Sequence, residues 1–163
     1  MKHIGIIADT HGCFDKPLQD FLAGADEIWH AGDIGSLELA DLIAAFKPLR
    51  AVYGNIDAAP TRRAFKKTEF FECEGLKVMM THIGGYSNRY EQSVAETIAV
   101  KKPDILVTGH SHILKIFRDK TFNLLNINPG AAGCYGFHAV RTAVRLIIDN
   151  GELRDLEVGE WPR

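Results

Sequence analysis

Apolar residues in the first third of the chain fall into short runs separated by helical patterns. The runs at 3–8, 27–30 and 49–53 have the length expected of buried strands. The stretches 14–23 and 36–46 carry apolar positions at the spacing of one helix face. Alternation of this kind predicts a largely parallel sheet, in which the C-terminal ends of neighbouring strands lie side by side.

The rest of the chain is dominated by strand patterns. Residues 69–73 and 76–81 flank a tight turn at Glu74-Gly75, which predicts a hairpin. A helix is expected over 90–101, because Pro103 follows it. The remaining expected strands are 105–108, 114–118, 122–126, 139–149 and 152–158. We therefore expect an α/β (α+β) fold in one domain over residues 1–163, with two packed β-sheets flanked by helices. The first sheet would be wound with helices and the second mostly antiparallel.

Composition narrows the classes of protein and of partner. The chain has 163 residues, of which 46% are hydrophobic and 25% charged, as in ordinary globular domains. A chain of this length buries roughly two-thirds of its unfolded surface, so a metal is not needed for folding and is free to be catalytic. The net charge of -2 gives no basic footprint for nucleic acid or an anionic membrane, and neither partner is expected. The basic cluster Arg62, Arg63, Lys66 and Lys67 is interpreted as a solvated face.

The cysteines and the N-terminus bear on location. Cys13, Cys73 and Cys134 are odd in number, widely spaced and without a Cys-x-x-Cys pair, which fits a reducing cytoplasm. The first residues run directly into a short strand and contain no signal-peptide core, and no run reaches the ~20 apolar residues of a membrane helix. A cytoplasmic location is therefore expected.

Polar side chains follow the predicted strands, each close to a glycine. The candidate ligands are Asp9, His11, Asp33, Asn55, His82, His110 and His112, and the neighbouring glycines are Gly12, Gly32, Gly54, Gly84 and Gly109. Glycine lacks a Cβ atom, so the backbone can crowd around a small object such as a divalent cation. Carboxylate and imidazole ligands suit such ions, and seven ligands exceed the three or four of one catalytic zinc. Two ions about 3.5 to 4 Å apart need an anion between them, and Asp33 is the candidate bridge.

These residues resemble the pattern of the calcineurin-like metallophosphoesterases. Its elements stand in order as Asp9-Thr10-His11, Gly32-Asp33, Gly54-Asn55, His82 and Gly109-His110-Ser111-His112. The short chain and the Asn128-Pro129-Gly130 turn resemble the small bacterial and archaeal phosphodiesterase branch. A zinc hydrolase of the metallo-β-lactamase type is disfavoured, because Ile113-Leu114 follows His112 where that type has an Asp-His pair.

The resemblance implies a four-layer αββα sandwich that binds two divalent metal ions. Asp9, His11 and His112 would hold one ion, and Asn55, His82 and His110 the other, with Asp33 shared. Asp33, Asn55 and His82 are the expected catalytic residues. Mn²⁺ is the expected metal, although the same ligands accept Fe, Ni, Co or Zn. The implied activity is hydrolysis of a small phosphate ester, above all a phosphodiester, by a metal-bridging hydroxide.

Two departures and two alternatives accompany this interpretation. Ile56 stands where many relatives have a His, and loss of a proton donor can cost about 10² to 10⁴-fold with a poor leaving group. Ala131 replaces the serine of an Asn-Pro-Gly-Ser motif. The chief alternative is a catalytically weak, metal-binding interaction scaffold like a retromer subunit of the same fold. A nuclease is disfavoured by the missing basic surface, and small relatives often form homo-oligomers.

Other polar residues have both functional and structural interpretations. Asp57 either orients His11 or the Asn55 loop, or only caps a turn. Tyr135, His138 and Arg89 could contact substrate, with a surface or structural role favoured for each. Cys13 is expected to be a small buried residue, and His3 and His30 are expected to be structural.

Overall fold

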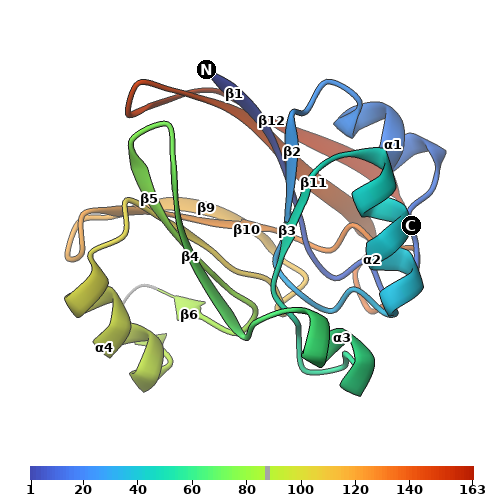
Figure 1. Cartoon of the computed structure of the whole chain (residues 1–163), viewed down its shortest axis with the longest axis horizontal. Helices are drawn as coiled ribbons and strands as arrows, with labels where there is room; N and C mark the ends of the chain where they lie inside the picture. The colour runs from blue at the N-terminus through green and yellow to red at the C-terminus, as the bar shows by residue number, and fades with distance from the viewer. Residues whose placement is uncertain (87–88) are drawn as a thin grey trace.

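Two five-stranded mixed sheets pack face to face in the computed structural model, which describes residues 1–86 and 89–163 (Figure 1). The strands of the first sheet are β1 (Lys2–Ile7), β2 (Glu27–His30), β3 (Leu49–Ala51), β11 (Val140–Asp149) and β12 (Glu152–Pro162). Their order is β12-β11-β1-β2-β3. As expected from the alternating pattern, β1, β2 and β3 are parallel, so the loops that follow them leave the same edge.

The second sheet contains the strands from the middle of the chain. They are β4 (Thr68–Cys73), β5 (Leu76–Thr81), β8 (Ile105–Val107), β9 (Leu114–Asp119) and β10 (Leu124–Pro129), in the order β4-β5-β8-β10-β9. The three central strands are parallel, and the outer two pair antiparallel to their neighbours. A short antiparallel pair of strands, β6 (Gly85–Tyr86) and β7 (Arg89–Tyr90), lies outside both sheets.

Helices cover the outer faces and complete four layers (Figure 1). The helices are α1 (Lys16–Leu22), α2 (Leu37–Phe46), α3 (Ala59–Ala64) and α4 (Gln92–Lys101). Side chains of α1 and α2 pack with Ile7 and Ile28 on the first sheet, and α4 packs with Met79 and Leu106 on the second. Successive strand residues face opposite sides, so Ile4 and Ile6 instead enter the core between the sheets. The predicted fold class is confirmed.

The second sheet differs from its prediction in strand direction. β11 and β12 belong to the first sheet, where β11 pairs antiparallel with β1 at Ile4 and Leu146. The second sheet is consequently mixed, and the prediction that it is mostly antiparallel is wrong. The physical reason is burial: Ala143, Val144, Leu146 and Ile148 are all buried, which suits a strand inside a sheet with both faces covered.

The cysteines also depart from expectation. Cys13 and Cys134 form a disulfide with a Cα–Cα distance of 5.9 Å, and Cys73 is a buried free thiol. The bond ties the loop after β1 to the loop after β10, at a sequence separation of 121 that the chain's local pattern does not reveal. Because disulfides persist mainly in oxidising compartments, this one counts against the cytoplasmic location, which stays a prediction. No helix within residues 1–86 and 89–163 is long and apolar enough to cross a membrane.

Candidate metal centre

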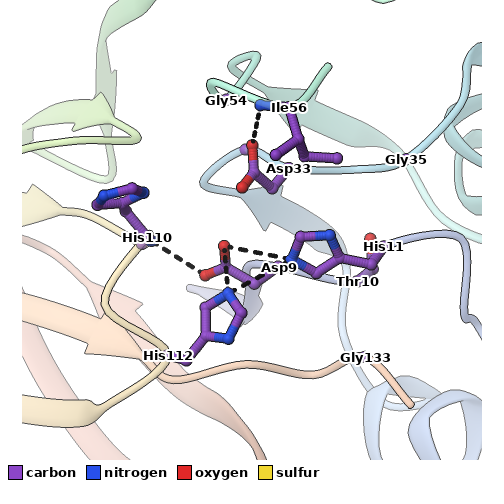
Figure 2. Close-up of polar contacts among 12 residues, drawn as sticks. Asp9, Thr10, His11, Asp33, Gly35, Gly54, Ile56, His110, His112 and Gly133 are labelled. Atoms are coloured by element: carbon purple, nitrogen blue, oxygen red, sulfur yellow. Dashed lines mark hydrogen bonds and ion pairs between the residues drawn. The ribbon is translucent and has the colours of Figure 1, made fainter. Parts of the chain in front are cut away.

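All seven predicted ligands lie together where the two sheets meet. Asp9 and His11 follow β1, Asp33 follows β2, Asn55 follows β3, His82 follows β5, and His110 and His112 follow β8. Each strand of this set ends at the same edge of its sheet, which is why ligands far apart in sequence converge. Figure 2 shows the imidazoles of His11 and His112 pointing toward the Asp9 carboxylate, with Asp33 nearby.

One group of donors gathers around Asp9. Its Oδ1 lies 3.4 Å from His112 Nε2 and 3.9 Å from His11 Nε2. The two imidazole nitrogens are themselves 3.4 Å apart. One ligand atom from each of these three residues lies within 4.8 Å of the others, a spacing that could hold a metal ion.

A second group gathers around His82. Its Nε2 lies 3.2 Å from Asp33 Oδ2 and 3.0 Å from Asn55 Oδ1, and Asn55 Oδ1 is also 3.0 Å from His110 Nδ1. Asp33, His82 and His110 form another set that could hold an ion. The two groups adjoin, because His82 Nε2 is only 3.9 Å from Asp9 Oδ1.

The hydrogen bonds around His82 indicate that the centre requires a positive charge. His82 Nδ1 donates to the Ala31 carbonyl at 2.7 Å, so a neutral ring turns its Nε2 lone pair toward the oxygens of Asp33 and Asn55. Lone pairs repel at such distances unless a proton or a metal ion lies between them. The site geometry therefore fits a cation.

Asp9 provides a second indication of a cation. Its carboxylate is fully buried, and its Oδ2 accepts the backbone N–H of His110 at 3.0 Å. Its Oδ1 has no hydrogen bond to any described residue. A buried carboxylate oxygen without a donor is costly unless a charge satisfies it, and a divalent ion among Asp9, His11 and His112 would do so.

Electrostatics in the centre lower the pKa of Asp33 and raise the pKa of two imidazoles, those of His82 and His112. Burial of His82 opposes its protonation, but the Asp33 hydrogen bond and the charges of Asp9 and Asp33 outweigh it and raise the pKa of His82. Burial likewise opposes ionisation of Asp33, yet its pKa is lowered by His82 and by the Ile56 N–H. The Asp9 carboxylate raises the pKa of His112. The pocket therefore attracts positive charge, as a cation site should.

Five of the seven candidate ligands have left-handed backbone. The φ angles are 52° at Asp9, 45° at His11, 55° at Asp33, 72° at His110 and 59° at His112. Such a conformation costs a non-glycine residue on the order of 1 kcal/mol or more, and it clusters at functional sites. The surrounding fold must hold these loops in place.

The glycines beside the ligands provide room, as predicted, at three of five positions. A Cβ on Gly54 would lie 2.0 Å from Asp33 Oδ1, and one on Gly32 would lie 2.7 Å from His82 Nδ1. A Cβ on Gly109 would come within 2.9 Å of Ala8 and 3.1 Å of His82 Nδ1. A Cβ on Gly12 would meet no atom within 4 Å, and a Cβ on Gly84 would meet Thr108. Neither glycine therefore makes room for a ligand.

Asp57 joins two ligand-bearing loops. Its buried carboxylate accepts the backbone N–H groups of Ile34 at 3.2 Å, Gly35 at 3.0 Å and Gly54 at 2.8 Å. The bond to Gly54 caps its own turn, and the other two reach the loop that carries Asp33. Asp57 thus orients the Asn55 loop relative to Asp33, which combines both interpretations offered by the sequence.

His30 has the structural role expected of it. Its Nδ1 accepts the Gly32 N–H at 3.1 Å, so its Nε2 carries the proton and donates to Thr10 Oγ1 at 2.8 Å. Thr10 Oγ1 in turn donates to the Ile34 carbonyl at 2.9 Å. Complete burial lowers the pKa of His30 to about 3 and keeps the ring neutral. This chain of bonds fixes the loop of Asp9 against the loop of Asp33.

Asn128 supports the last ligand loop, a role the sequence did not indicate beyond its turn motif. Its side-chain amide donates to the Gly109 carbonyl at 2.9 Å and to Ser111 Oγ at 3.1 Å. His138 is buried beside His112, with ring centroids 5.3 Å apart. Tyr135 and Arg89 are exposed, the latter in β7.

Two cavities adjoin the centre. One of about 440 Å³ lies over it and is lined by five of the candidate ligands together with apolar side chains of Ile56, Ile113 and Phe137. The other, of about 600 Å³, is lined by Asn55 and His82 on the side facing α4. Asn55 therefore borders both spaces.

Comparisons with known proteins agree with this geometry. The sequence model of the calcineurin-like phosphoesterase superfamily domain matches residues 1–151. A probable metallophosphoesterase of Methanothermobacter thermautotrophicus is 26% identical over 133 residues, which are 78% of this chain and 76% of that protein. Vps29 of Entamoeba histolytica, solved with Zn²⁺, shares the fold with a TM-score of 0.73 at 18% identity, over 98% of both chains.

A predicted phosphoesterase from Streptococcus pneumoniae TIGR4 has the same fold, with a TM-score of 0.68 at 19% identity over 99% of this chain and 98% of that one. At such low sequence identities the solved structures show only that the fold is shared. The family model, by contrast, matches the sequence itself over most of the chain. The family is one that binds divalent metals, in agreement with the donor groups found here. On the match over residues 1–151, this chain belongs to the calcineurin-like phosphoesterase superfamily.

Proposed function

We propose that this chain hydrolyses phosphodiesters at a centre of two divalent metal ions. The observation that carries the proposal is the pair of adjoining donor groups, the first of which contains the buried Asp9 Oδ1, an oxygen without a hydrogen bond to any described residue. Membership of a family of metal-dependent phosphoesterases supports it. Asp9, His11 and His112 would hold one ion, Asn55, His82 and His110 the other, and Asp33 would touch both.

The bound ions, of which Mn²⁺ is our expectation, would neutralise phosphoryl oxygens and lower the pKa of a water from 15.7 toward about 7. The chain's own residues prepare the site. The lowered pKa of Asp33 keeps its carboxylate ionised, and the bond from His82 Nδ1 to Ala31 fixes the ring so that Nε2 faces the centre. Asp33, Asn55 and His82 are therefore the residues we expect to be essential to catalysis.

Hydrolysis forms one P–O bond to the oxygen of water and breaks the P–O bond to the leaving group, whose oxygen ends with a proton or as a free anion. Ile56 stands beside the centre and has no proton to give. A leaving group that is stable as an anion, such as a nitrophenolate, would therefore depart more easily than an alkoxide. Because two cavities meet at Asn55, each could hold one organic group of a diester, which supports a diester over a monoester.

The test is hydrolysis of bis(4-nitrophenyl) phosphate by protein stripped of metal and then supplied with Mn²⁺, Fe²⁺, Ni²⁺, Co²⁺ or Zn²⁺ in turn. We expect metal-dependent release of nitrophenolate, lost by at least ~100-fold in Asp33→Asn and in His82→Gln. His3→Gln is the matched control, because His3 also carries an imidazole and lies in β1 of the first sheet, but lines a separate cavity. Activity that survives without metal, or in both site variants, would refute the proposal.

The alternative function is an interaction scaffold that binds metal without efficient catalysis. Apolar side chains around the centre favour it: Ile56 is 49% exposed, Ile113 58% and Phe137 fully exposed. One Vps29 structure, from Chaetomium thermophilum, contains a bound cyclic peptide and shares this fold with a TM-score of 0.67 at 14% identity. Stoichiometric metal binding without turnover of any ester in a panel of monoesters, diesters and cyclic nucleotides would support the scaffold.

A further inference from the structure

The cavity of about 600 Å³ beside the centre contains cationic side chains that the metal site does not use. It lies between the strands β4 and β5, the helix α4 and the loop that follows β3, and Asn55 and His82 form its border with the centre. Arg62 and Lys67, two members of the basic cluster, line it. An organic group attached to a phosphate in the centre could extend into this space.

Arg62 is held in a defined position at the border. Its Nε donates to the Asp57 carbonyl at 2.6 Å and its Nη2 donates to the Asn55 carbonyl at 2.8 Å. The guanidinium also lies 5.2 Å from the ring centroid of Tyr53. Carbonyls and a tyrosine ring carry no net charge, so the positive charge of Arg62 is oriented but not neutralised.

Lys67 adds a second cation to the lining. Among the residues that the structure describes, neither Lys67 nor Arg62 forms an ion pair, whereas their neighbour Lys66 pairs with Glu69 at 3.8 Å. Glu91 is the single carboxylate in the described lining, so positive charge exceeds negative there. Apart from Asn55 and His82 at the border, the remaining polar side chains of the lining carry hydroxyl groups, from Tyr53, Thr68, Thr81, Ser93 and Thr97.

We infer that this cavity binds a second phosphate group on the substrate, so that the chain prefers phosphodiesters in which one organic group is itself phosphorylated. The inference rests on the proposed function. The planar guanidinium of arginine matches phosphate oxygens, lysine supplies a mobile positive charge, and Ser93 adds a hydroxyl. The hydroxyls of Thr68, Thr81 and Thr97 already donate within the protein. Because Arg62 is bonded to the carbonyl of Asn55, the second phosphate would lie next to the one that is cleaved.

The experiment compares two chromogenic diesters that differ in one phosphate: the 4-nitrophenyl ester of thymidine 5′-phosphate with and without a 3′-phosphate. Wild-type protein should show a kcat/KM higher by about 10- to 100-fold for the 3′-phosphorylated ester, the size of one charge-assisted hydrogen bond. Lys67→Gln and Arg62→Gln should each reduce this preference to below about 3-fold, since each removes one charge from the cavity. Arg63→Gln is the matched control, because it removes an exposed arginine of the same helix that is not part of the lining and should leave the preference intact.

The possible failures are distinguishable. Equal turnover of the two esters by the wild type, or a preference that persists in Lys67→Gln, would overturn the inference while leaving the proposed function in place. If neither ester is cleaved, the proposed function fails, and calorimetric binding of thymidine 3′,5′-bisphosphate and thymidine 5′-phosphate to the Mn²⁺-loaded protein decides the inference. Tighter binding of the bisphosphate that Lys67→Gln abolishes would support it, and equal affinities would overturn it.

Discussion

Replacement of Gly54 by alanine should disrupt the centre through one added methyl group. The new Cβ would lie 2.0 Å from Asp33 Oδ1 and 2.4 Å from the Asp33 backbone nitrogen. Real Cβ atoms do not approach other atoms so closely, and one of the two atoms belongs to backbone that cannot rotate away. Asp33 must therefore shift, and with it the carboxylate that we expect to touch both ions.

The energetic cost follows from two contributions. Overpacking of a tight contact costs about 1–3 kcal/mol. The shift also breaks the bond from the Ile56 N–H to Asp33 Oδ1, and a hydrogen bond to a charged group contributes about 1.5–3 kcal/mol. The sum of about 3–6 kcal/mol corresponds to a fall in Tm on the order of 10 °C for a chain of this size.

Thermal unfolding with and without Mn²⁺ measures both the stability of the fold and the metal affinity of the centre. At a metal concentration 100 times Kd, wild-type protein should gain about 2.7 kcal/mol. A variant whose affinity is 100-fold weaker would gain only about 0.4 kcal/mol at the same concentration. The metal-dependent rise in Tm should therefore almost disappear in Gly54→Ala, together with ester hydrolysis.

Gly24→Ala is the matched control for this prediction. A Cβ on Gly24 meets no atom within 4 Å, and its φ lies outside the left-handed region. That substitution should leave metal binding unchanged and stabilise the protein by about 0.4–1 kcal/mol, because alanine restricts the unfolded chain. A Gly54→Ala protein with wild-type Tm and an undiminished metal effect would refute the reasoning about crowding.

Three further predictions concern other parts of the molecule. Ile56→His should raise kcat/KM for alkyl phosphodiesters by about 10²-fold or more but change nitrophenyl ester hydrolysis little, because only the poor leaving group needs a proton; equal effects on both would contradict this. Since the folded-state pKa of His30 is about 3, below the unfolded value of 6.5, its stabilising contribution is complete above pH 6.5 and is lost as pH falls toward 3. Urea titrations should therefore show wild-type stability falling about 2 kcal/mol more than that of His30→Gln between pH 6.5 and 4.5, and parallel curves would exclude this assignment. Reductant should lower the unfolding free energy of the wild type by up to about 5 kcal/mol, because the disulfide restricts the unfolded chain by closing a loop over a sequence separation of 121. It should leave a Cys13→Ser/Cys134→Ser double variant unaffected.

The position of the centre was predictable because each ligand follows a strand by only a few residues. A short loop cannot carry Asp33 or His82 far from the end of its strand, so the order of strands and motifs was enough to bring them together. The three parallel strands of the first sheet were predictable for a similar reason, since the periodicity of apolar residues is local, whereas the four-layer arrangement came from the family resemblance.

What the sequence missed depends on contacts between distant segments. The pairing of β11 with β1 and the disulfide between Cys13 and Cys134 join residues more than a hundred positions apart, and no local pattern encodes their meeting. That Arg62 and Lys67 line a cavity also escaped prediction, because α4, which is distant in sequence, forms the other wall of that cavity. A run of basic residues looks the same in sequence whether it faces a cavity or bulk water.

The left-handed backbone at five candidate ligands has a consequence for how ions would enter. At about 1 kcal/mol or more per residue, the strain amounts to several kcal/mol, a sizeable share of the 5–15 kcal/mol that stabilises a typical domain. That cost is offset by bonds such as those of Asp57 and His30, whose donors and acceptors lie outside the seven candidate ligands and therefore do not depend on a metal ion. Ion uptake then requires little reordering of the loops, and the affinity of the site is not diminished by the entropy of assembling it.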